Sequence, residues 1–535
     1  MTVPQVPGVK VRSRRSDSVW EVQADRLHDL QGLAVASVGA ARLTEVDVTV
    51  ARWRAPSAGW LGSAHVPGIA SQSVEPRGRG VRVRLSAVDE ADPAVLLAGV
   101  VRFLLPWRTD PGPELTFAPG LPREAAPLAP RLRDVLLEGE QRDAHVRRSD
   151  LLVVPEPGSA PDAERATTLV VSPDGWVRDG EAFDVCVDPT VHRPVGRRSE
   201  GHTDVAQASI RDRDVHLSGP GIRMSIQGRV TAPQVTALRS VGAVVGELPD
   251  VVARQLNACG ILTAASTDLL PSADDALAWL AASVHGRRHA LRRYGPAPAV
   301  DGWPSVSAVM VTHRPDHLES AVRQLSALRY PDLQVVLGIH GRRVDPAWAW
   351  DLLQDLPFPS TMVTIPGEAT LGEALQACSD RAEGALVTKM DDDDVYGPEH
   401  IWDLVLARQY SGAHVVGKAL DWIHLQTGQV TVFRPTYAAE KYARFVAGGT
   451  ILISRADLAE VGGWRPVPKS VDRALLDRVL DDGGLVYRTH GLGYVYVRHG
   501  HGHTASVEDD HFLTKASATV PGLVQHPEFG TGGGP

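Results

Sequence analysis

The chain has 535 residues, more than one hydrophobic core usually supports, so two or three domains are expected. Its composition, 43% hydrophobic and 22% charged residues, is typical of a globular protein that dissolves in water. The formal net charge of -9 gives no electrostatic footprint for nucleic acid, and we therefore expect no nucleic acid partner.

The cysteines and the apolar segments bear on the compartment. The chain holds three cysteines, Cys186, Cys259 and Cys378, too few and too scattered for a disulfide framework or a thiolate metal site. The first residues are basic without an apolar run behind them, so we expect no signal peptide. The most hydrophobic segment, residues 93–107, is shorter than the ~20 residues of a transmembrane helix. It is interpreted as a buried element or as a helix on a membrane surface, and the predicted location is the cytoplasm, with the inner face of the membrane left open.

The N-terminal part of the chain reads as β-rich. Residues 81–85 and 168–171 alternate apolar and polar side chains with period two, the pattern of strands. Proline-rich polar stretches at 106–130 and 155–163 predict loops or linkers. Residues 1–232 are therefore predicted to form a β-rich α+β domain, or two subdomains, of unknown role.

The next segment reads as helical. Apolar residues recur at helical spacing from Val235 through Leu238 and Val241, which predicts a helical connector over residues 233–304. Proline and glycine between residues 294 and 304 cannot continue a helix, so we place a domain boundary there.

Beyond this boundary, apolar strands alternate with amphipathic helices. The predicted elements are a strand at 306–312, a helix at 316–328 with Asp316 as its cap, a strand at 333–339, a helix at 370–383 and a strand at 385–390. Continuously apolar strands separated by helices indicate a parallel sheet covered on both faces. In such sheets the ligand crevice lies outside the carboxyl ends of the strands.

Four consecutive aspartates, residues 391–394, directly follow the strand predicted at 385–390. Adjacent carboxylates repel one another and raise one another's pKa unless a cation or water offsets the repulsion. At the end of a strand in this kind of sheet, they suit a divalent cation and a phosphate-bearing substrate. The alternatives are a solvated loop, or a cap for a helix at 398–408, although one cap needs only one carboxylate.

The acidic run is one of several motifs in a fixed order. The others are Thr312-His313-Arg314-Pro315, Leu371-Gly372-Glu373-Ala374-Leu375, Gly448-Gly449-Thr450, Gly462-Gly463-Trp464, Val471-Asp472 and the histidine-rich segment 498–504. In this order, residues 305 to about 515 resemble the family 2 glycosyltransferases, which are inverting enzymes. The resemblance implies the GT-A fold, a Rossmann-like mixed and mainly parallel α/β sheet that binds nucleotide sugars. The chain departs from the family pattern after the second strand, where His340-Gly341 replaces an acidic segment.

The resemblance also implies roles for individual residues. The family's Asp-x-Asp motif falls on Asp391 and Asp393, which implies a bound Mn²⁺ or Mg²⁺, and His499 or His503 is implied to complete the metal shell, while His501 reads as a loop residue. The general base is implied to be Asp472, with Asp477 as the alternative and a helix cap as the other interpretation of Asp472. The residues implied to bind the nucleotide sugar are Thr312, Arg314, Gly372, Lys389 and Asp392. Those on the acceptor side are Gly448, Gly449 and Thr450.

The implied function is a metal-dependent, inverting transfer of a sugar from a UDP- or GDP-linked donor to a hydroxyl of a glycan or lipid-linked acceptor, in polysaccharide or cell-envelope glycan synthesis. One alternative is a nucleotidyltransferase, but the chain lacks a glycine-rich signature after the first strand. Another is a non-catalytic carbohydrate-binding or scaffold protein with a decayed transferase domain. The transferase domain is expected at 305–515, followed by a flexible tail at 516–535.

Overall fold

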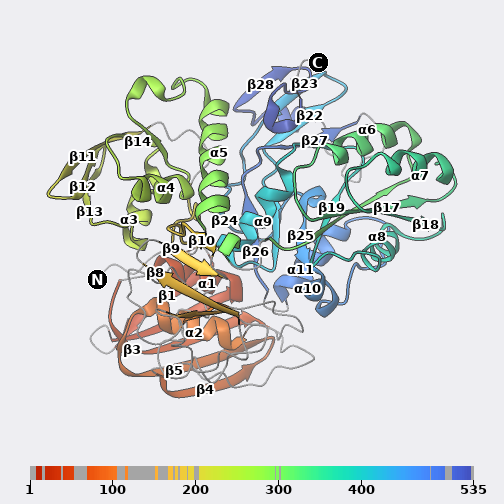
Figure 1. The fold of residues 1–535 in the computed structure, drawn as a ribbon. Coiled ribbons are helices and arrows are strands. Elements are labelled where there is room, and N and C mark those ends of the chain that lie inside the picture. The colour runs from red at the N-terminus through yellow and green to blue at the C-terminus, as the bar shows by residue number, and fades with distance from the viewer. Residues whose placement is uncertain are drawn as a thin grey trace.

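The structure is a computed structural model. It describes residue 6 and residues 8–14, 18–37, 40–53, 69–104, 115–117, 151–154, 167–172, 175–178, 181–189, 191–197, 204–295, 297–299, 303–481, 484–499 and 509–531. Within these ranges the chain forms five sheets. Figure 1 shows the first sheet below the rest of the molecule, with helix α5 (Ala276–Tyr294) standing between the middle and C-terminal parts.

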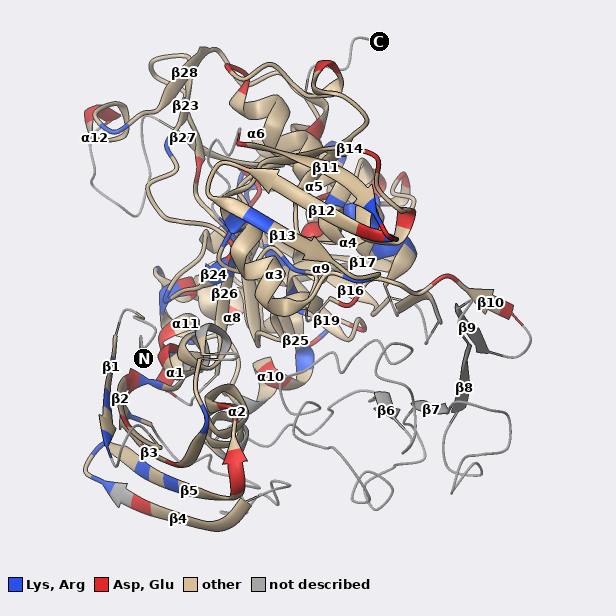
Figure 2. Cartoon of the chain, turned by 90° about the vertical axis from the view of Figure 1, so that its left-hand side faces the viewer, with Lys and Arg blue, Asp and Glu red and all other residues tan. Residues whose placement is uncertain are grey.

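The first sheet carries two helices on one face. Its strands are β1 (Val9–Arg14), β2 (Val19–Arg26), β3 (Leu43–Arg52), β4 (Ile69–Arg77) and β5 (Gly80–Ala91), in the order β1-β2-β3-β5-β4. Helices α1 (Leu27–Ala36) and α2 (Pro93–Leu104) pack with β2, β3 and β5 in one apolar cluster. Figure 2 shows basic and acidic residues along β4 and β5, where Arg82 and Arg84 bind Asp47 at 2.5 and 3.1 Å.

Helix α2 decides between the two interpretations of the most apolar segment, residues 93–107, as a buried element or a helix on a membrane surface. Leu97 and Val100 have no exposed surface and pack in the cluster between the two helices and the first sheet. The segment is therefore a buried element as far as Leu104, and residues 105–107 lie outside the described part. A search of the described helices finds none that combines the length and apolar character of a membrane span.

Two further sheets follow, and they correct the predicted connector. One has the order β10-β9-β8-β7-β6, from β6 (Leu115–Phe117), β7 (Leu151–Val154), β8 (Thr167–Ser172), β9 (Gly175–Arg178) and β10 (Glu181–Phe183). The other has the order β13-β12-β11-β14-β15, from β11 (Val205–Arg211), β12 (Asp214–Gly219), β13 (Ile222–Ile226), β14 (Ala243–Gly246) and β15 (Leu262–Ala264). Helices α3 (Ala232–Ala237) and α4 (Asp250–Ala258) belong to this third unit.

The boundary predicted at residue 232 therefore divides one unit, because β14 pairs in parallel with β11. Residues 233–304 are not a purely helical connector. The apolar residues Val241, Val244 and Val245 have helical spacing, but a short apolar run cannot be told from a buried strand by periodicity alone. The β-rich character predicted for the N-terminal region is confirmed.

The C-terminal part is built on an eight-stranded mixed sheet. Its order is β18 (Ser360–Ile365), β17 (Leu333–His340), β16 (Val306–Thr312), β19 (Leu386–Met390), β25 (Leu452–Ser454), β21 (Val415–Lys418), β26 (Val486–Thr489) and β24 (Lys441–Tyr442). Neighbouring strands from β18 to β19 run parallel, and β25 is antiparallel to both of its neighbours. The Rossmann-like, mixed and mainly parallel α/β sheet is confirmed.

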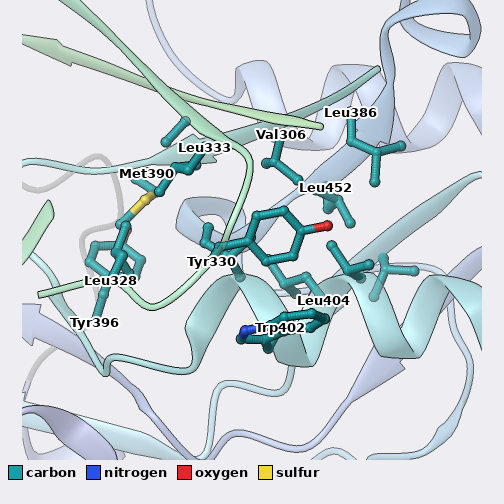
Figure 3. Close-up of a cluster of buried hydrophobic side chains, with 14 of the residues drawn as sticks. Val306, Leu328, Tyr330, Leu333, Leu386, Met390, Tyr396, Trp402, Leu404 and Leu452 are labelled. Carbon is teal, nitrogen blue, oxygen red and sulfur yellow. The ribbon is translucent and has the colours of Figure 1, made fainter. Parts of the chain in front are cut away.

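Helices cover both faces of this sheet (Figure 1). On β16, Ala308 and Met310 pack with α6 (Pro315–Ser326), α7 (Pro346–Gln354) and α9 (His400–Ser411). Val309 points to the other face, with α8 (Leu371–Ser379), α10 (Arg455–Glu460) and α11 (Val471–Asp481). Figure 3 shows the first core, in which Trp402 lies against Tyr330, with 4.8 Å between the ring centroids. Burial on both faces explains why the strands are apolar throughout.

Helix starts follow local chemistry. Thr370 caps α8 by accepting a hydrogen bond from the Glu373 N–H, and Glu373 binds back to the Thr370 N–H at 2.7 Å. Helix α6 begins at Pro315, whose fixed φ suits the first helical position. The predicted cap Asp316 therefore lies inside the first turn and does not cap the helix.

A smaller sheet completes the C-terminal part. It includes residues that were predicted to form a flexible tail. Its order is β20 (Val395–Tyr396), β27 (Tyr494–Arg498), β22 (Trp422–Leu425), β23 (Val430–Phe433) and β28 (Ala518–Pro521). Beyond α12 (Asp509–Leu513), β28 pairs with β23, and Phe529 is buried against Trp422. The segment as far as residue 531 is thus integrated in the fold and is not a flexible tail, because its apolar residues complete this sheet.

Candidate functional site

The acidic run lies at the carboxyl end of β19, as the sequence predicts, and its side chains alternate in exposure. The side chains of Asp391 and Asp393 are 37% and 18% exposed. Asp392 and Asp394 are buried. The run is therefore not a fully solvated loop, and the residue that precedes α9 is Glu399, so the run does not cap that helix. Two carboxylates face outward and two hold the loop in place.

Asp392 is held by residues from the end of β16. The Thr312 hydroxyl donates to Asp392 Oδ2 at 2.5 Å and accepts from the Arg314 N–H at 3.1 Å. The Arg314 guanidinium also lies 3.3 Å from Asp392 Oδ1. Thr312 and Asp392, implied to bind nucleotide, thus make internal contacts that join two strand ends.

Asp394 is held from the other side by β27. The Tyr494 hydroxyl donates to Asp394 Oδ2 at 2.7 Å, and the Val497 N–H donates to Oδ1 at 2.9 Å. Burial, together with the charges of Asp391 and Asp393, raises the pKa of Asp394 well above its usual range. These bonds fix the end of the acidic loop against the smaller sheet.

Lys389 lies between the acidic run and the candidate base. Its ammonium contacts Asp391 Oδ1 at 2.7 Å, Asp472 Oδ1 at 3.3 Å and the Gly448 carbonyl at 3.3 Å. Burial alone would lower the pKa of Lys389, but Asp391 and Asp472 outweigh burial and raise it. The side chain is 3% exposed, so this lysine organises the two carboxylates.

Gly448 and Gly449 bring the backbone close to both sets of carboxylates. A Cβ on Gly448 would lie 2.2 Å from Asp472 Oδ2, and one on Gly449 would lie 2.8 Å from Asp391 Oδ2. Only glycine allows this approach without a shift. Thr450, by contrast, is buried and bonds to the Ala447 carbonyl and the Lys418 N–H, which is a structural role.

Asp393 lies beside Arg314 and His499. Arg314 Nη1 lies 2.5 Å from Asp393 Oδ2, and His499 Nε2 lies 3.6 Å from the same oxygen. His499 Nδ1 also pairs with Gln426 at 2.7 Å. Of the other histidines in this segment, His501 and His503 lie outside the described residues.

A metal site needs several donor atoms that converge on one point. In the part of the chain that the structure describes, no three His, Cys, Asp or Glu side chains converge as a metal-binding group. Asp391 and Asp393 nonetheless provide partly exposed oxygens, and His499 provides a nitrogen beside one of them. Such donors fit a divalent cation of the Mn²⁺ type.

The remaining predicted residues, Asp472, Asp477 and Gly372, contact different parts of the structure. Asp472 lies in the first turn of α11 and faces Lys389. Asp477, the alternative base, is 53% exposed and pairs with Arg473 on its own helix. A Cβ on Gly372 would lie 1.6 Å from the Arg465 carbonyl, so Gly372 contacts that backbone rather than the acidic loop.

Sequence reasoning missed two residues that shape the acidic loop. The Tyr396 hydroxyl accepts from the Asp391 N–H at 2.7 Å and donates to the Gly449 carbonyl at 2.9 Å. Gln324 on α6 accepts from the Tyr396 N–H at 2.8 Å and donates to the Asp394 carbonyl at 3.2 Å. The position of Tyr396, five residues after Asp391, was the one feature of the sequence that could have indicated its role in this loop.

Comparison with known proteins adds little at this level of similarity. No protein-family model and no curated protein matches the chain. A solved structure of S. aureus TarS 1-349 in complex with UDP-GlcNAc is 13% identical, with a TM-score of 0.32, over 39% of this chain and 64% of that one. Mannosyltransferase PcManGT from Pyrobaculum calidifontis, in complex with GDP-Man and Mn²⁺, is 15% identical, with a TM-score of 0.30, over 37% and 57%. GalNAc-T7 with UDP, GalNAc and Mn²⁺ is 12% identical, with a TM-score of 0.31, over 37% and 44%.

The chain thus spans less than two thirds of each of these structures. The TM-scores are too low to support an inference about activity, which therefore depends on the site itself.

Proposed function

We propose that this protein is a glycosyltransferase that moves a sugar from a nucleotide-sugar donor to a hydroxyl of an acceptor with inversion at the anomeric carbon. One observation carries the proposal. The partly exposed carboxylates of Asp391 and Asp393 lie at the carboxyl end of β19, and a third carboxylate, that of Asp472, lies across Lys389 from Asp391. Ligands of parallel α/β sheets bind at this edge.

The carboxylates of Asp391 and Asp393, with His499, would hold a Mn²⁺ or Mg²⁺ ion. The bound ion supplies positive charge that neutralises the diphosphate leaving group. Arg314 is 35% exposed and lies at the same loop, so its guanidinium is placed to contact the diphosphate of a UDP- or GDP-linked donor. Lys389 is buried and remains with the two carboxylates that it joins.

Asp472 would act as the general base. The acceptor hydroxyl oxygen forms a bond to the anomeric carbon, the bond from that carbon to the diphosphate oxygen breaks, and the hydroxyl proton passes to the Asp472 carboxylate. Its side chain is 30% exposed, which leaves an oxygen accessible to an acceptor. Lys389 orients this carboxylate, and Gly448 provides the space beside it.

The test is the release of nucleoside diphosphate from a panel of UDP- and GDP-sugars by the purified full-length chain, with Mn²⁺ and with EDTA. We expect release with at least one donor, its loss in EDTA, and its loss in the double variant Asp391→Asn/Asp393→Asn. The matched control is Asp351→Asn, which removes an exposed carboxylate on α7 of the same domain.

A folded chain that binds sugars but releases no diphosphate with any donor would support the non-catalytic alternative. Release that is unchanged in the double variant would show that the acidic run is not the site. The acceptor proposed from the sequence, a glycan or a lipid-linked sugar in polysaccharide or envelope synthesis, is tested by adding glycans and lipid-linked sugars to the same assay once a donor is known.

A further inference from the structure

Two exposed aromatic rings lie together on the loop segment that connects β23 to the short helix at Gly448–Thr450, one on each side of the short strand β24. Tyr437 and Phe445 are 44% and 43% exposed. Their ring centroids are 4.6 Å apart, with the planes at 89°. Within the described ranges, Tyr437 and Phe445 are the two large exposed apolar side chains whose rings contact each other. Contiguous exposed apolar surface marks binding sites, whereas singly scattered apolar residues need no explanation.

The pair is held rigidly by Arg488 of β26. The Arg488 guanidinium donates to the Ala438 carbonyl at 2.9 and 3.0 Å and to the Phe445 carbonyl at 3.1 Å. Its carbon lies 5.5 Å from the Tyr437 ring centroid and 4.9 Å from that of Phe445. One buried arginine thus fixes both ends of the loop and both rings, so a ligand would find the surface already formed.

The centre of the loop is anchored as well. Glu440 is 1% exposed and binds Arg287 at 2.5 Å, with Tyr487 donating to it at 2.8 Å. Its φ of 54° is unusual for a residue other than glycine, and these bonds stabilise it. The rings of Tyr437 and Phe445 therefore project from a loop with little freedom.

The loop leads directly to the candidate base. Phe445 precedes Gly448 by three residues, so their Cα atoms are at most about 11 Å apart. Gly448 in turn lies against the Asp472 carboxylate. On the other side, Arg444 binds Asp25 of the first sheet at 3.1 Å. Phe445 is thus adjacent in sequence to Arg444, which contacts the first sheet, and three residues from Gly448, which contacts the candidate base.

We propose that Tyr437 and Phe445 bind a pyranose ring of the acceptor glycan, next to the sugar whose hydroxyl is deprotonated by Asp472. The C–H face of a pyranose is apolar and fits the electron-rich face of an aromatic ring, while its hydroxyls stay in water. Two rings set at nearly right angles offer one face and one edge. The surface is too small and too interrupted by charge at Arg444 for a protein or a bilayer. The assignment of this sugar to the acceptor rests on the proposed function, whereas the proposed binding of a sugar by Tyr437 and Phe445 does not.

The test measures binding without turnover. Saturation-transfer difference NMR is recorded on the full-length chain with four probes: the methyl pyranosides of glucose, galactose, mannose and N-acetylglucosamine. We expect ring C–H protons of at least one probe to receive saturation, and the dissociation constant to rise about tenfold in Tyr437→Leu/Phe445→Leu. Leucine keeps apolar bulk and removes the rings. The matched control is Trp350→Leu, which removes an exposed aromatic ring from α7.

Several results would overturn the proposal: no saturation of any probe by the wild-type chain, equal binding by the double leucine variant, or equal loss in the Trp350→Leu control. Assays of diphosphate release separate it from the proposed function. If the rings bind a glycoside but the chain turns over no donor, the sugar site stands and the transferase proposal fails. If the chain turns over a donor but its glycoside binding is unchanged when the rings are removed, the transferase proposal stands and the sugar site fails.

Discussion

The Lys389 ammonium lies 3.3 Å from Asp472 Oδ1 and 2.7 Å from Asp391 Oδ1, so one buried cation joins the candidate base to the candidate metal-binding loop. The two carboxylates come from β19's end and from α11, elements some eighty residues apart in the chain. Repulsion between them is offset by the charge they share. The lysine therefore fixes the relative position of the two halves of the site.

We predict that Lys389→Met lowers the free energy of unfolding by about 1–3 kcal/mol, because it leaves Asp391 and Asp472 facing each other without their cation. The second substitution Asp472→Asn, made in the Lys389→Met chain, should restore part of this loss. Urea unfolding of the four chains of this double-mutant cycle measures the coupling. Effects that add to within about 0.5 kcal/mol would show that the two residues do not interact.

A second prediction concerns the proton acceptor. Asp472→Asn should lower the transfer rate by roughly 10²–10⁴-fold, since an amide cannot take the proton of the acceptor hydroxyl. Donor affinity should hardly change. The measurement is transfer at saturating donor, beside donor binding by calorimetry. The parallel variant Asp477→Asn tests the alternative base, and a large loss of transfer there with none at Asp472 would reverse the assignment.

A third prediction uses the close approach of the backbone at Gly448. In Gly448→Ala the new Cβ would lie 2.2 Å from Asp472 Oδ2, so the flexible carboxylate must rotate away. Displacement of a catalytic group by about 1 Å can cost roughly 10²-fold in rate, whereas stability should change little. Steady-state transfer and thermal unfolding together distinguish the two effects.

The control for this variant is Gly428→Ala, where the nearest atom to the new Cβ is in Val430 at 3.5 Å, an ordinary contact. Its transfer rate should equal that of the wild-type chain. A rate for Gly448→Ala that also stays at the wild-type level would argue against Asp472 as the base.

The sequence predicted β16, β17 and β19 because strands buried on both faces are continuously apolar. It missed β14 because Val244 and Val245 fit helical spacing equally well, and pairing with β11 decided the outcome. The position of the acidic run at the end of β19 was predicted from the sequence, whereas Asp391 and Asp393 were singled out by the resemblance and the burial of Asp392 and Asp394 was not predicted. No local pattern could show that Tyr494, a hundred residues later, bonds Asp394, because that contact exists only once the two sheets meet.

A fourth prediction concerns the junction between α5 and the C-terminal sheet. Arg288 on α5 binds Asp403 through two bonds of 2.7 and 2.9 Å, and Lys418 shares that carboxylate at 2.6 Å. Arg288→Met should lower the free energy of unfolding by about 3–5 kcal/mol, because it leaves a buried carboxylate with part of its charge unbalanced. Chemical denaturation measures the loss, and Arg293→Met, an exposed arginine of the same helix, is the control.

The same ion pair bears on the domain boundary. A fragment that begins at Val306 would lack α5 and leave Asp403 and Glu440 without their arginines. We therefore expect such a fragment to be insoluble, contrary to what the linker composition of residues 294–304 alone suggests. Recovery of a soluble, cooperatively unfolding fragment from Val306 would show that these contacts are dispensable.

The last prediction follows from a histidine held neutral in the interior. His192 is 3% exposed; its Nδ1 accepts from the Asp188 N–H at 3.0 Å, and its Nε2 donates to the Val230 carbonyl at 2.8 Å. Burial lowers the pKa of His192 from 6.5 to about 4, and a proton on Nδ1 would point at the Asp188 N–H.

In the unfolded chain the ring titrates near its ordinary value. Between about pH 6.5 and 4 the unfolded state thus binds more protons, so the free energy of unfolding falls as the pH falls through this window and is independent of this group above it. We expect the difference in unfolding free energy between wild type and His192→Gln to shrink by about 1.5 kcal/mol from pH 6.5 to 5, measured by urea unfolding at each pH. The control His285→Gln replaces an exposed histidine on α5 and should follow the wild-type curve. Parallel curves for His192→Gln and wild type across this window would mean that His192 titrates alike in both states.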